Sequence, residues 1–158
     1  MTEMTKPAVE PALAPPAVVK VLNPVLRTVL GSPLHGVAST FMVLHVRGRR
    51  TGRVYDVPVG RHTLDGQLMT FAGGAWKVNL RGGADLEVTI DGRRRTAHAE
   101  LEEDHERVSE IFDRLLRGLG NKRANRVGLK VNVDRPPTLD EVRAGTAGRA
   151  MVLLTLTD

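Results

Sequence analysis

The sequence predicts a mainly β fold with flanking helices, of the α+β class, arranged as a small antiparallel barrel. Between residues 41 and 101, short runs of apolar and β-branched residues follow one another and are separated by tight turns. Helical patterns lie before and after this region and do not alternate with its strands, which disfavours a doubly wound parallel sheet. Closing the sheet into a barrel would also remove its exposed edges.

The strand predictions depend on apolar runs and on the turn residues between them. Asp65-Gly66 and Asp91-Gly92 are two-residue hairpin signals, and Gly48 to Gly52 forms a longer hairpin tip. Pro58 places its segment at an edge or a bulge, because proline has no N–H for a neighbouring strand. The expected strands are Phe41–Arg47, Arg53–Arg61, Gln67–Ala72, Leu86–Ile90, Arg93–Leu101 and Arg149–Thr157.

Helices are predicted where apolar residues recur at steps of three and four. Ala17–Leu30 and Glu102–Leu119 have this pattern, and the acidic first turn of the second complements a helix dipole. Thr138 and Glu141 have the form of a capping box for a short helix. Residues 120–137 are basic and show no clear period.

The chain length of 158 residues predicts one globular domain, which we place at residues 17–158. Residues 1–16 are rich in proline and alanine without a hydrophobic period, so we expect a disordered tail. The chain has no cysteine, which excludes disulfides, thiolate metal sites and cysteine catalysis. Since no signal-peptide pattern or membrane-spanning apolar run is visible, we expect a cytoplasmic protein.

Basic residues are concentrated in one part of the chain. The net charge is +5, and 18 of the 23 basic residues are arginine, which suits bidentate contact with phosphate or carboxylate. Residues 47–61 carry five arginines against Asp56 alone. This segment is expected to face an anionic partner.

The hairpin tip Gly48-Arg49-Arg50-Thr51-Gly52 within this segment combines glycines, two arginines and a hydroxyl. Glycines allow a close approach of the backbone to an anion, and the side chains supply donors. Because the spacing is not that of a P-loop, a solvated basic tip is the alternative to a phosphate site.

A second group of candidate residues follows Gly73-Gly74. Trp76, Asn79 and Leu80 lie at steps of three and four in a short predicted helix, Trp76–Arg81, so they share one face. Such a face suits a flat heteroaromatic ligand. The alternative is that Trp76 is a core residue and Asn79 a helix cap.

Taken in order, these motifs resemble the deazaflavin (F420)-dependent nitroreductase and quinone reductase family of split β-barrel flavoproteins. The resemblance covers roughly residues 20–100 and includes the hairpin tip, Val57-Pro58-Val59, Gly73-Gly74 and Trp76-x-x-Asn79-Leu80. It implies an FMN-binding-like split barrel that transfers a hydride from reduced F420 to a quinone-like or other electron-poor acceptor. No nucleophile or metal is required for this chemistry.

The resemblance also implies roles for individual residues. Arg49, Arg50, Thr51 and Gly52 would meet the phosphate and acidic tail of F420. The segment Val57, Pro58 and Val59 would present backbone groups to the deazaflavin ring. Gly73 and Gly74 would allow close passage, while Trp76 and Asn79 would fix the loop that covers the cofactor.

Other hypotheses remain at this stage. With Tyr55 as its only tyrosine, the chain could instead be a non-catalytic binding protein for FMN, haem or a lipid. Nucleic-acid binding is disfavoured by the scarcity of aromatic residues. The predicted helix at 17–30 could touch a membrane surface, and the protein is expected to be a monomer or a homodimer.

The five histidines have no metal-ligand spacing, so no metal site is expected. His45 lies in an apolar strand, where a histidine is more often a satisfied core residue than a ligand or base. A redox pocket could nevertheless use it to donate to a substrate oxygen.

Overall fold

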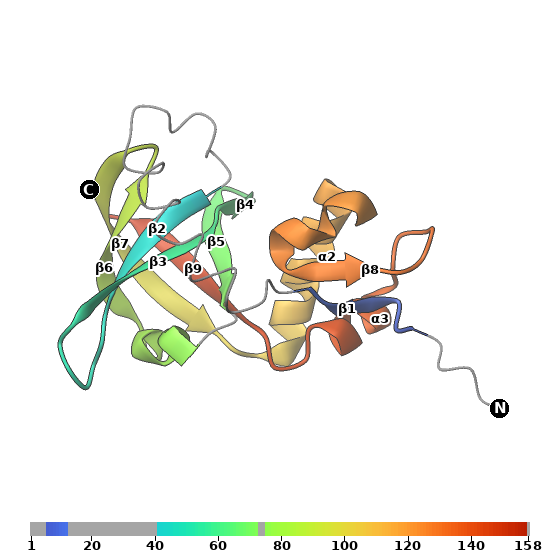
Figure 1. Cartoon of the computed structure of the whole chain (residues 1–158), viewed down its shortest axis with the longest axis horizontal. Coiled ribbons are helices and arrows are strands. Elements are labelled where there is room, and N and C mark those ends of the chain that lie inside the picture. The colour runs from blue at the N-terminus through green and yellow to red at the C-terminus, as the bar shows by residue number, and fades with distance from the viewer. Residues whose placement is uncertain (1–5, 13–40, 73–74, 158) are drawn as a thin grey trace. The chain divides into compact units, whose positions relative to one another are not determined.

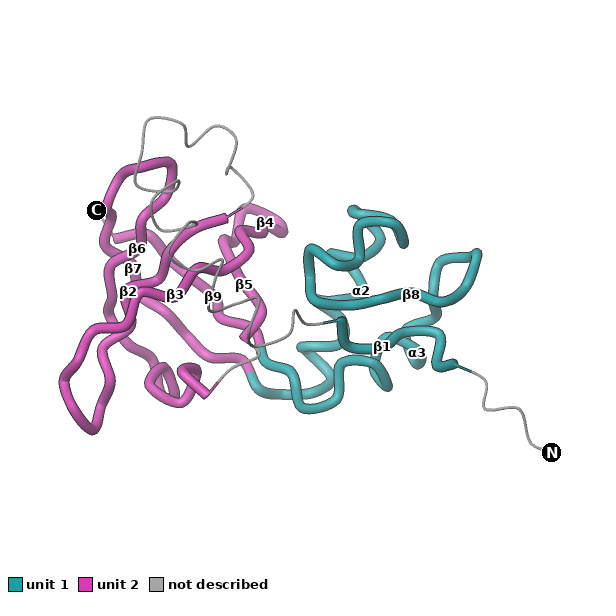
Figure 2. Tube along the Cα trace, in the orientation of Figure 1, with its two compact units in different colours: residues 1–13, 103–150 teal, residues 14–102, 151–158 magenta. Residues whose placement is uncertain are grey.

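The computed structural model describes residues 6–12, 41–72 and 75–157. These residues fall into two compact units, shown separately coloured in Figure 2. We call residues 41–72, 75–102 and 151–157 the barrel unit, and residues 6–12 with 103–150 the helical unit. The helix predicted at Ala17–Leu30 lies outside the described residues, and the single domain at 17–158 stays a prediction.

The barrel unit contains a seven-stranded sheet of order β3-β2-β6-β7-β9-β5-β4. The pairings with a determined register are all antiparallel. The sheet curls, as Figure 1 shows, and β3 at one end of the order approaches β5 near the other. This curled half-barrel confirms the α+β, split-barrel prediction. Its elements are β2 (Phe41–Arg47), β3 (Val54–Gly60), β4 (His62–Leu64), β5 (Gln67–Ala72), η2 (Ala75–Leu80), β6 (Ala84–Ile90), β7 (Arg93–Glu102) and β9 (Ala150–Leu156).

Local turn chemistry determines the hairpins of this sheet. Asp65 and Asp91 have φ of 52° and 51°, and the glycines after them, Gly66 and Gly92, have φ of 78° and 77°. Two successive residues with positive φ are typical of the type I′ turn, which matches the twist of the flanking strands. The two Asp-Gly hairpin predictions are therefore confirmed.

Alternation along β2 directs its most deeply buried side chains to one face of the sheet. Met42, Leu44 and Val46 of β2 are at most 1% exposed, and Val88 of β6 is fully buried on the same face. His45 and Arg47, between and beside them, point to the opposite face, which we call the outer face. The barrel core therefore consists of aliphatic residues, as the low aromatic content requires.

The helical unit holds the C-terminal helices and two short strands. Its elements are β1 (Val9–Pro11), α2 (His105–Leu119), η3 (Asn121–Val127), β8 (Leu129–Val131) and α3 (Leu139–Gly145). The apolar face of α2 is buried around Phe112, which has no exposed surface. None of the helices in the described part of the chain is long and apolar enough to cross a membrane.

The expectation of a disordered tail is wrong for Val9–Pro11. This segment forms β1, which pairs antiparallel with β8, so that Val9 lies opposite Val131. Val9 is only 2% exposed, and Asn132 donates from its side chain to the carbonyl of Pro7 at 2.8 Å. Burial of Val9 and pairing with a strand 120 residues away stabilise a segment whose composition alone predicts disorder.

Gly145 provides a test of this packing. A Cβ atom at Gly145 would lie 2.6 Å from Val9 Cγ1 and 2.7 Å from the Val9 carbonyl oxygen. We expect Gly145→Ala to lower the free energy of unfolding by about 1–3 kcal/mol, because β1 must move. Gly118→Ala in α2 is the matched control, since a Cβ there meets nothing and alanine favours a helix. Urea unfolding of both variants measures the difference, and equal stabilities would refute this close packing of β1.

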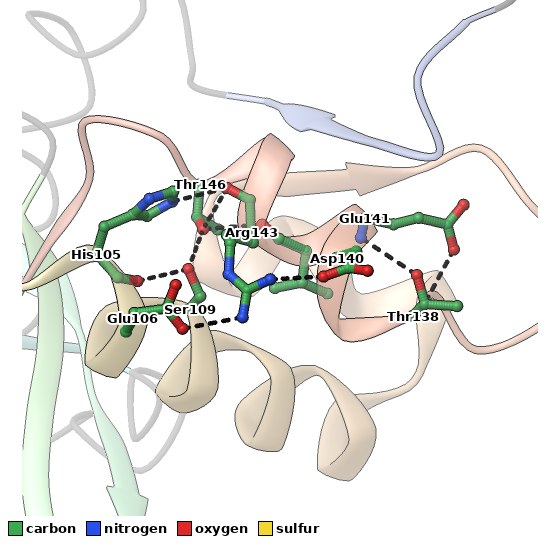
Figure 3. A network of polar contacts seen from close by, with 9 residues as sticks. His105, Glu106, Ser109, Thr138, Asp140, Glu141, Arg143 and Thr146 are labelled. Atoms are coloured by element: carbon green, nitrogen blue, oxygen red, sulfur yellow. Dashed lines mark hydrogen bonds and ion pairs between the residues drawn. The ribbon is translucent and has the colours of Figure 1, made fainter.

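A polar network fixes α3 against the start of α2 (Figure 3). The Arg143 guanidinium binds Glu106 of α2 at 2.9 Å and Asp140 of α3 at 2.5 Å. His105 donates from Nε2 to the Arg143 carbonyl at 2.8 Å. Thr138 and Glu141 form the predicted capping box at the start of α3, which confirms that motif.

Glu141 makes the helical unit sensitive to acid. Its carboxylate accepts hydrogen bonds from Arg135 and from the Thr138 backbone, which lower its pKa to about 2. A lowered pKa contributes stability above the ordinary value of 4.5, and this contribution is lost as the pH falls towards about 2. We therefore expect the urea midpoint to fall over this range, and less steeply in Glu141→Gln, which can still cap the helix. Identical pH curves for the two proteins would contradict this assignment.

Candidate cofactor site

The hairpin between β2 and β3 has a tight, glycine-dependent tip. Gly48 donates to the Arg53 carbonyl at 2.7 Å, and Gly52 donates to the Gly48 carbonyl at 2.8 Å. Gly52 has φ of 70°, which favours glycine. A Cβ at Gly48 would lie 3.1 Å from the Tyr55 ring and 3.2 Å from Thr51 Oγ1. The positive φ therefore makes Gly52 necessary for the shape of the tip, whereas a side chain at Gly48 would require Tyr55 or Thr51 to shift.

The arginines of this tip have different surroundings. Arg49 donates from its guanidinium to the carbonyl of Arg81, just beyond η2. Arg53 lies over the ring of Tyr55, with its guanidinium carbon 5.6 Å from the ring centroid. Arg50 is exposed, and its side chain has no polar partner among the residues that the structure describes. Arg50 is thus the tip arginine whose donors are available to an anion.

The structure brings the two predicted motif groups together. The backbone N–H of Arg49 donates to Asn79 Oδ1 at 3.0 Å, and Asn79 Nδ2 donates to the Trp76 carbonyl at 3.0 Å. The predicted short helix is a 3-10 helix, in which residues three apart lie in line, so Trp76 and Asn79 share one edge. Asn79 therefore connects the arginine tip to η2 across 30 positions of sequence.

The segment Val57, Pro58 and Val59 lies in β3, at the edge of the sheet among the described strands. Val57 is opposite Leu44 and Val59 is opposite Met42, so both valines share the face of the buried core. They are themselves only half-buried. The two valines therefore give the edge of β3 a partly exposed apolar surface. Pro58 is tolerated there because no further strand needs its missing N–H.

Gly73 and Gly74, predicted to allow close passage of a ligand, lie outside the described residues. Thr51 is exposed at the tip, where its Oγ1 accepts a hydrogen bond from the Arg53 backbone at 3.2 Å. Its hydroxyl hydrogen remains able to donate. The described site therefore offers guanidinium and hydroxyl donors at the hairpin tip. Strand β3, which begins two residues after Gly52, adds an apolar edge.

The family comparison decides the class of protein. A family model described as F420H(2)-dependent quinone reductase matches residues 25–136, which is more than half of the chain. The chain belongs to this family. The protein is therefore an oxidoreductase, and its cofactor is coenzyme F420. A search of the curated proteins found no match to the chain.

The chemistry of the exposed residues at the candidate site is compatible with this cofactor. Free guanidinium donors at Arg50 suit an anionic phosphate and acidic tail, and the half-buried edge of β3 suits a planar ring. Membership of the family favours the F420 hypothesis over a non-catalytic binding protein for FMN, haem or lipid.

Sequence reasoning did not identify two contributors to the geometry of the candidate site. The carbonyl of Arg81 accepts from Arg49, and Arg47 donates to the Gly52 carbonyl at 3.2 Å. Both contacts use backbone oxygens, which carry no residue-specific signal. The high arginine content of residues 47–61 was the only feature of the sequence that pointed to these contacts.

Proposed function

We propose that the protein binds reduced F420 at the arginine tip and along the edge of β3, and that it reduces a quinone-type acceptor. The observation that supports this most strongly is the pair of hydrogen bonds made by Asn79. They join a cation-rich hairpin to the helix that carries Trp76, at distances of 3.0 Å. These bonds hold the arginine tip, which suits the anionic tail of F420, at a fixed distance from η2 and Trp76, which suit its ring.

In this proposal the arginines of the tip have separate roles. Arg50 and the Thr51 hydroxyl bind the phosphate and acidic tail, because both are exposed and can donate. Arg49 shapes the tip through its bonds to Asn79 and Arg81. Gly52 keeps the backbone turn that presents these side chains.

The ring is proposed to lie against the edge of β3 at Val57, Pro58 and Val59. Apolar side chains there exclude water on one side of a flat ligand, while strand backbone supplies hydrogen-bonding groups. Trp76 and Asn79 limit the space at η2. When bound, reduced F420 supplies the hydride, so the protein has to bind, orient and shield the two reactants.

The acceptor is proposed to be a quinone, in line with the name of the family. The test is to mix the full-length protein with reduced F420 and duroquinone and to follow oxidation of the cofactor. We expect turnover that saturates with both reactants and disappears when either is omitted. Absence of turnover, with F420 bound, would contradict the proposed activity.

A further inference from the structure

Tyr55, the only tyrosine of the chain, lies at the start of the edge strand β3. Strand register places it opposite Val46, which is 1% exposed and faces the barrel core. Side chains alternate along a strand, so Tyr55 shares this core-side face of β3 with Val57 and Val59. It nevertheless keeps 41% of its surface exposed. The proposed face for the cofactor ring thus carries an aromatic residue that the barrel core does not cover.

Two contacts hold the ring of Tyr55 at the base of the arginine tip. The Arg53 guanidinium carbon lies 5.6 Å from the ring centroid, which is within the range of a cation–π contact. Gly48 leaves the room that the ring occupies, since a Cβ atom there would lie 3.1 Å from Tyr55 Cε2. Both contacts come from the same hairpin, so the ring is oriented before any ligand binds.

The phenol hydroxyl of Tyr55 makes no hydrogen bond with the residues that the structure describes. A phenol O–H can donate one hydrogen bond and can also accept one. Tyr55 therefore presents an apolar ring with a polar end that is available to a ligand. This combination suits a flexible partner in which carbon atoms and hydroxyl groups alternate.

Tyr55 lies between the two proposed ends of the cofactor site. Arg50 and Thr51, proposed for the phosphate and acidic tail, come before it in the hairpin. Val57 and Val59, proposed for the deazaflavin ring, come after it on the same face. A strand rises about 3.3 Å per residue, so Val57 lies about 7 Å beyond Tyr55. A cofactor that extends along this face from the ring site to the tip therefore passes Tyr55.

We propose that Tyr55 binds the polyol chain that joins the ring of F420 to its phosphate, and that it selects cofactors that carry this chain. The inference rests on the proposed function, which places the two ends of the cofactor. The phenol hydroxyl forms a hydrogen bond with a hydroxyl of the polyol, and the aromatic ring packs against the carbon atoms of the chain.

The experiment compares Tyr55→Phe and Tyr55→Ala by fluorescence titration. The probes are F420, the deazaflavin that keeps the polyol but lacks the phosphate and tail, and a deazaflavin with a methyl group in place of the polyol. Loss of one neutral hydrogen bond in Tyr55→Phe should raise the Kd for the first two probes by the same factor, about 3- to 10-fold. The third probe should bind Tyr55→Phe and the wild type equally. An increase in Kd for F420 alone would place Tyr55 at the tail and overturn the proposal.

Tyr55→Ala should raise the Kd for F420 at least about tenfold, because the packing of the aromatic ring is lost as well. Phe41→Ala is the matched control. Phe41 is an aromatic residue of similar exposure, 37%, and it alternates with Met42, so its side chain lies on the outer face of β2. Its removal should leave the Kd for F420 unchanged. Equal increases in Kd for the two alanine variants would refute a specific contact at Tyr55.

A second readout uses the wild-type protein alone. Because Tyr55 is the only tyrosine, incorporation of ring-labelled tyrosine gives NMR signals from this one residue. Saturation with F420 should shift these signals, and so should saturation with the deazaflavin that lacks the tail. Signals that stay unchanged while F420 is bound would show that Tyr55 does not contact the cofactor.

The outcomes separate this inference from the function on which it rests. If the wild type binds F420 and both Tyr55 variants bind it equally well, the role of Tyr55 is refuted while the proposed function stands. If the wild type does not bind F420, the proposed function fails and the inference fails with it.

Discussion

Replacing Arg50 by alanine is expected to raise the Kd for F420 about 10- to 150-fold. Arg50 is exposed at the hairpin tip without a polar partner in the described part of the chain, so its donors are proposed to bind the anionic tail. A hydrogen bond to a charged group contributes about 1.5–3 kcal/mol, and each 1.4 kcal/mol is tenfold in affinity. Fluorescence titration of F420 with the full-length variant measures the change.

Two other arginines serve as controls for this experiment. Arg49→Ala should have a smaller effect, because the backbone N–H that binds Asn79 is retained while the guanidinium contact with Arg81 is lost. Arg93→Ala removes the same charge from the exposed start of β7 and should leave the affinity unchanged. If Arg50→Ala and Arg93→Ala bind F420 equally well, the tip is not the tail site.

Phe112→Ala is expected to give the largest loss of stability, about 3–5 kcal/mol in the free energy of unfolding. Phe112 is the largest side chain in the described residues with essentially no exposed surface, and it lies on the buried face of α2. Truncation removes the transfer free energy of the ring and leaves a cavity. Urea unfolding followed by the helical circular-dichroism signal measures this loss.

The matched variant at this position is Phe112→Leu, which keeps most of the apolar volume. Its loss should be clearly smaller than that of the alanine variant, because a smaller cavity costs less free energy. Asp113→Ala is a second control on the same helix. It removes a carboxylate that forms an ion pair with the exposed Arg117 at 3.1 Å and leaves the core unchanged. Such a pair contributes at most about 1 kcal/mol. Equal losses for the alanine and leucine variants would show that Phe112 is not a core residue.

The parts of the fold that could be predicted are those determined by local chemistry. The Asp-Gly turns and the Thr138–Glu141 capping box each depend on residues within three positions of one another, and all are present. β1 could not be predicted, because its pairing partner Leu129–Val131 is distant in sequence and only three residues long. The 3-10 helix Asn121–Val127 was missed for a similar reason, since it is short and shows no regular apolar spacing.

The candidate site shows the same division. Arginine content and glycine spacing pointed to the hairpin tip, and Trp76 with Asn79 pointed to η2. The hydrogen bond between Asn79 and Arg49 depends on tertiary structure and could not be inferred from either motif alone. Asp56 was considered only as the single acid in a basic segment, whereas strand register places it directly opposite His45. Pairing across strands thus changes the interpretation of both residues.

The central claim is that this chain binds F420 through its arginine hairpin. It is tested most directly by titrating the full-length protein with F420 and, separately, with the deazaflavin that lacks the phosphate and acidic tail. We predict that F420 binds at least about tenfold more tightly, the equivalent of one charge-assisted hydrogen bond. Equal affinities for the two compounds, or no binding of F420 at all, would contradict the claim.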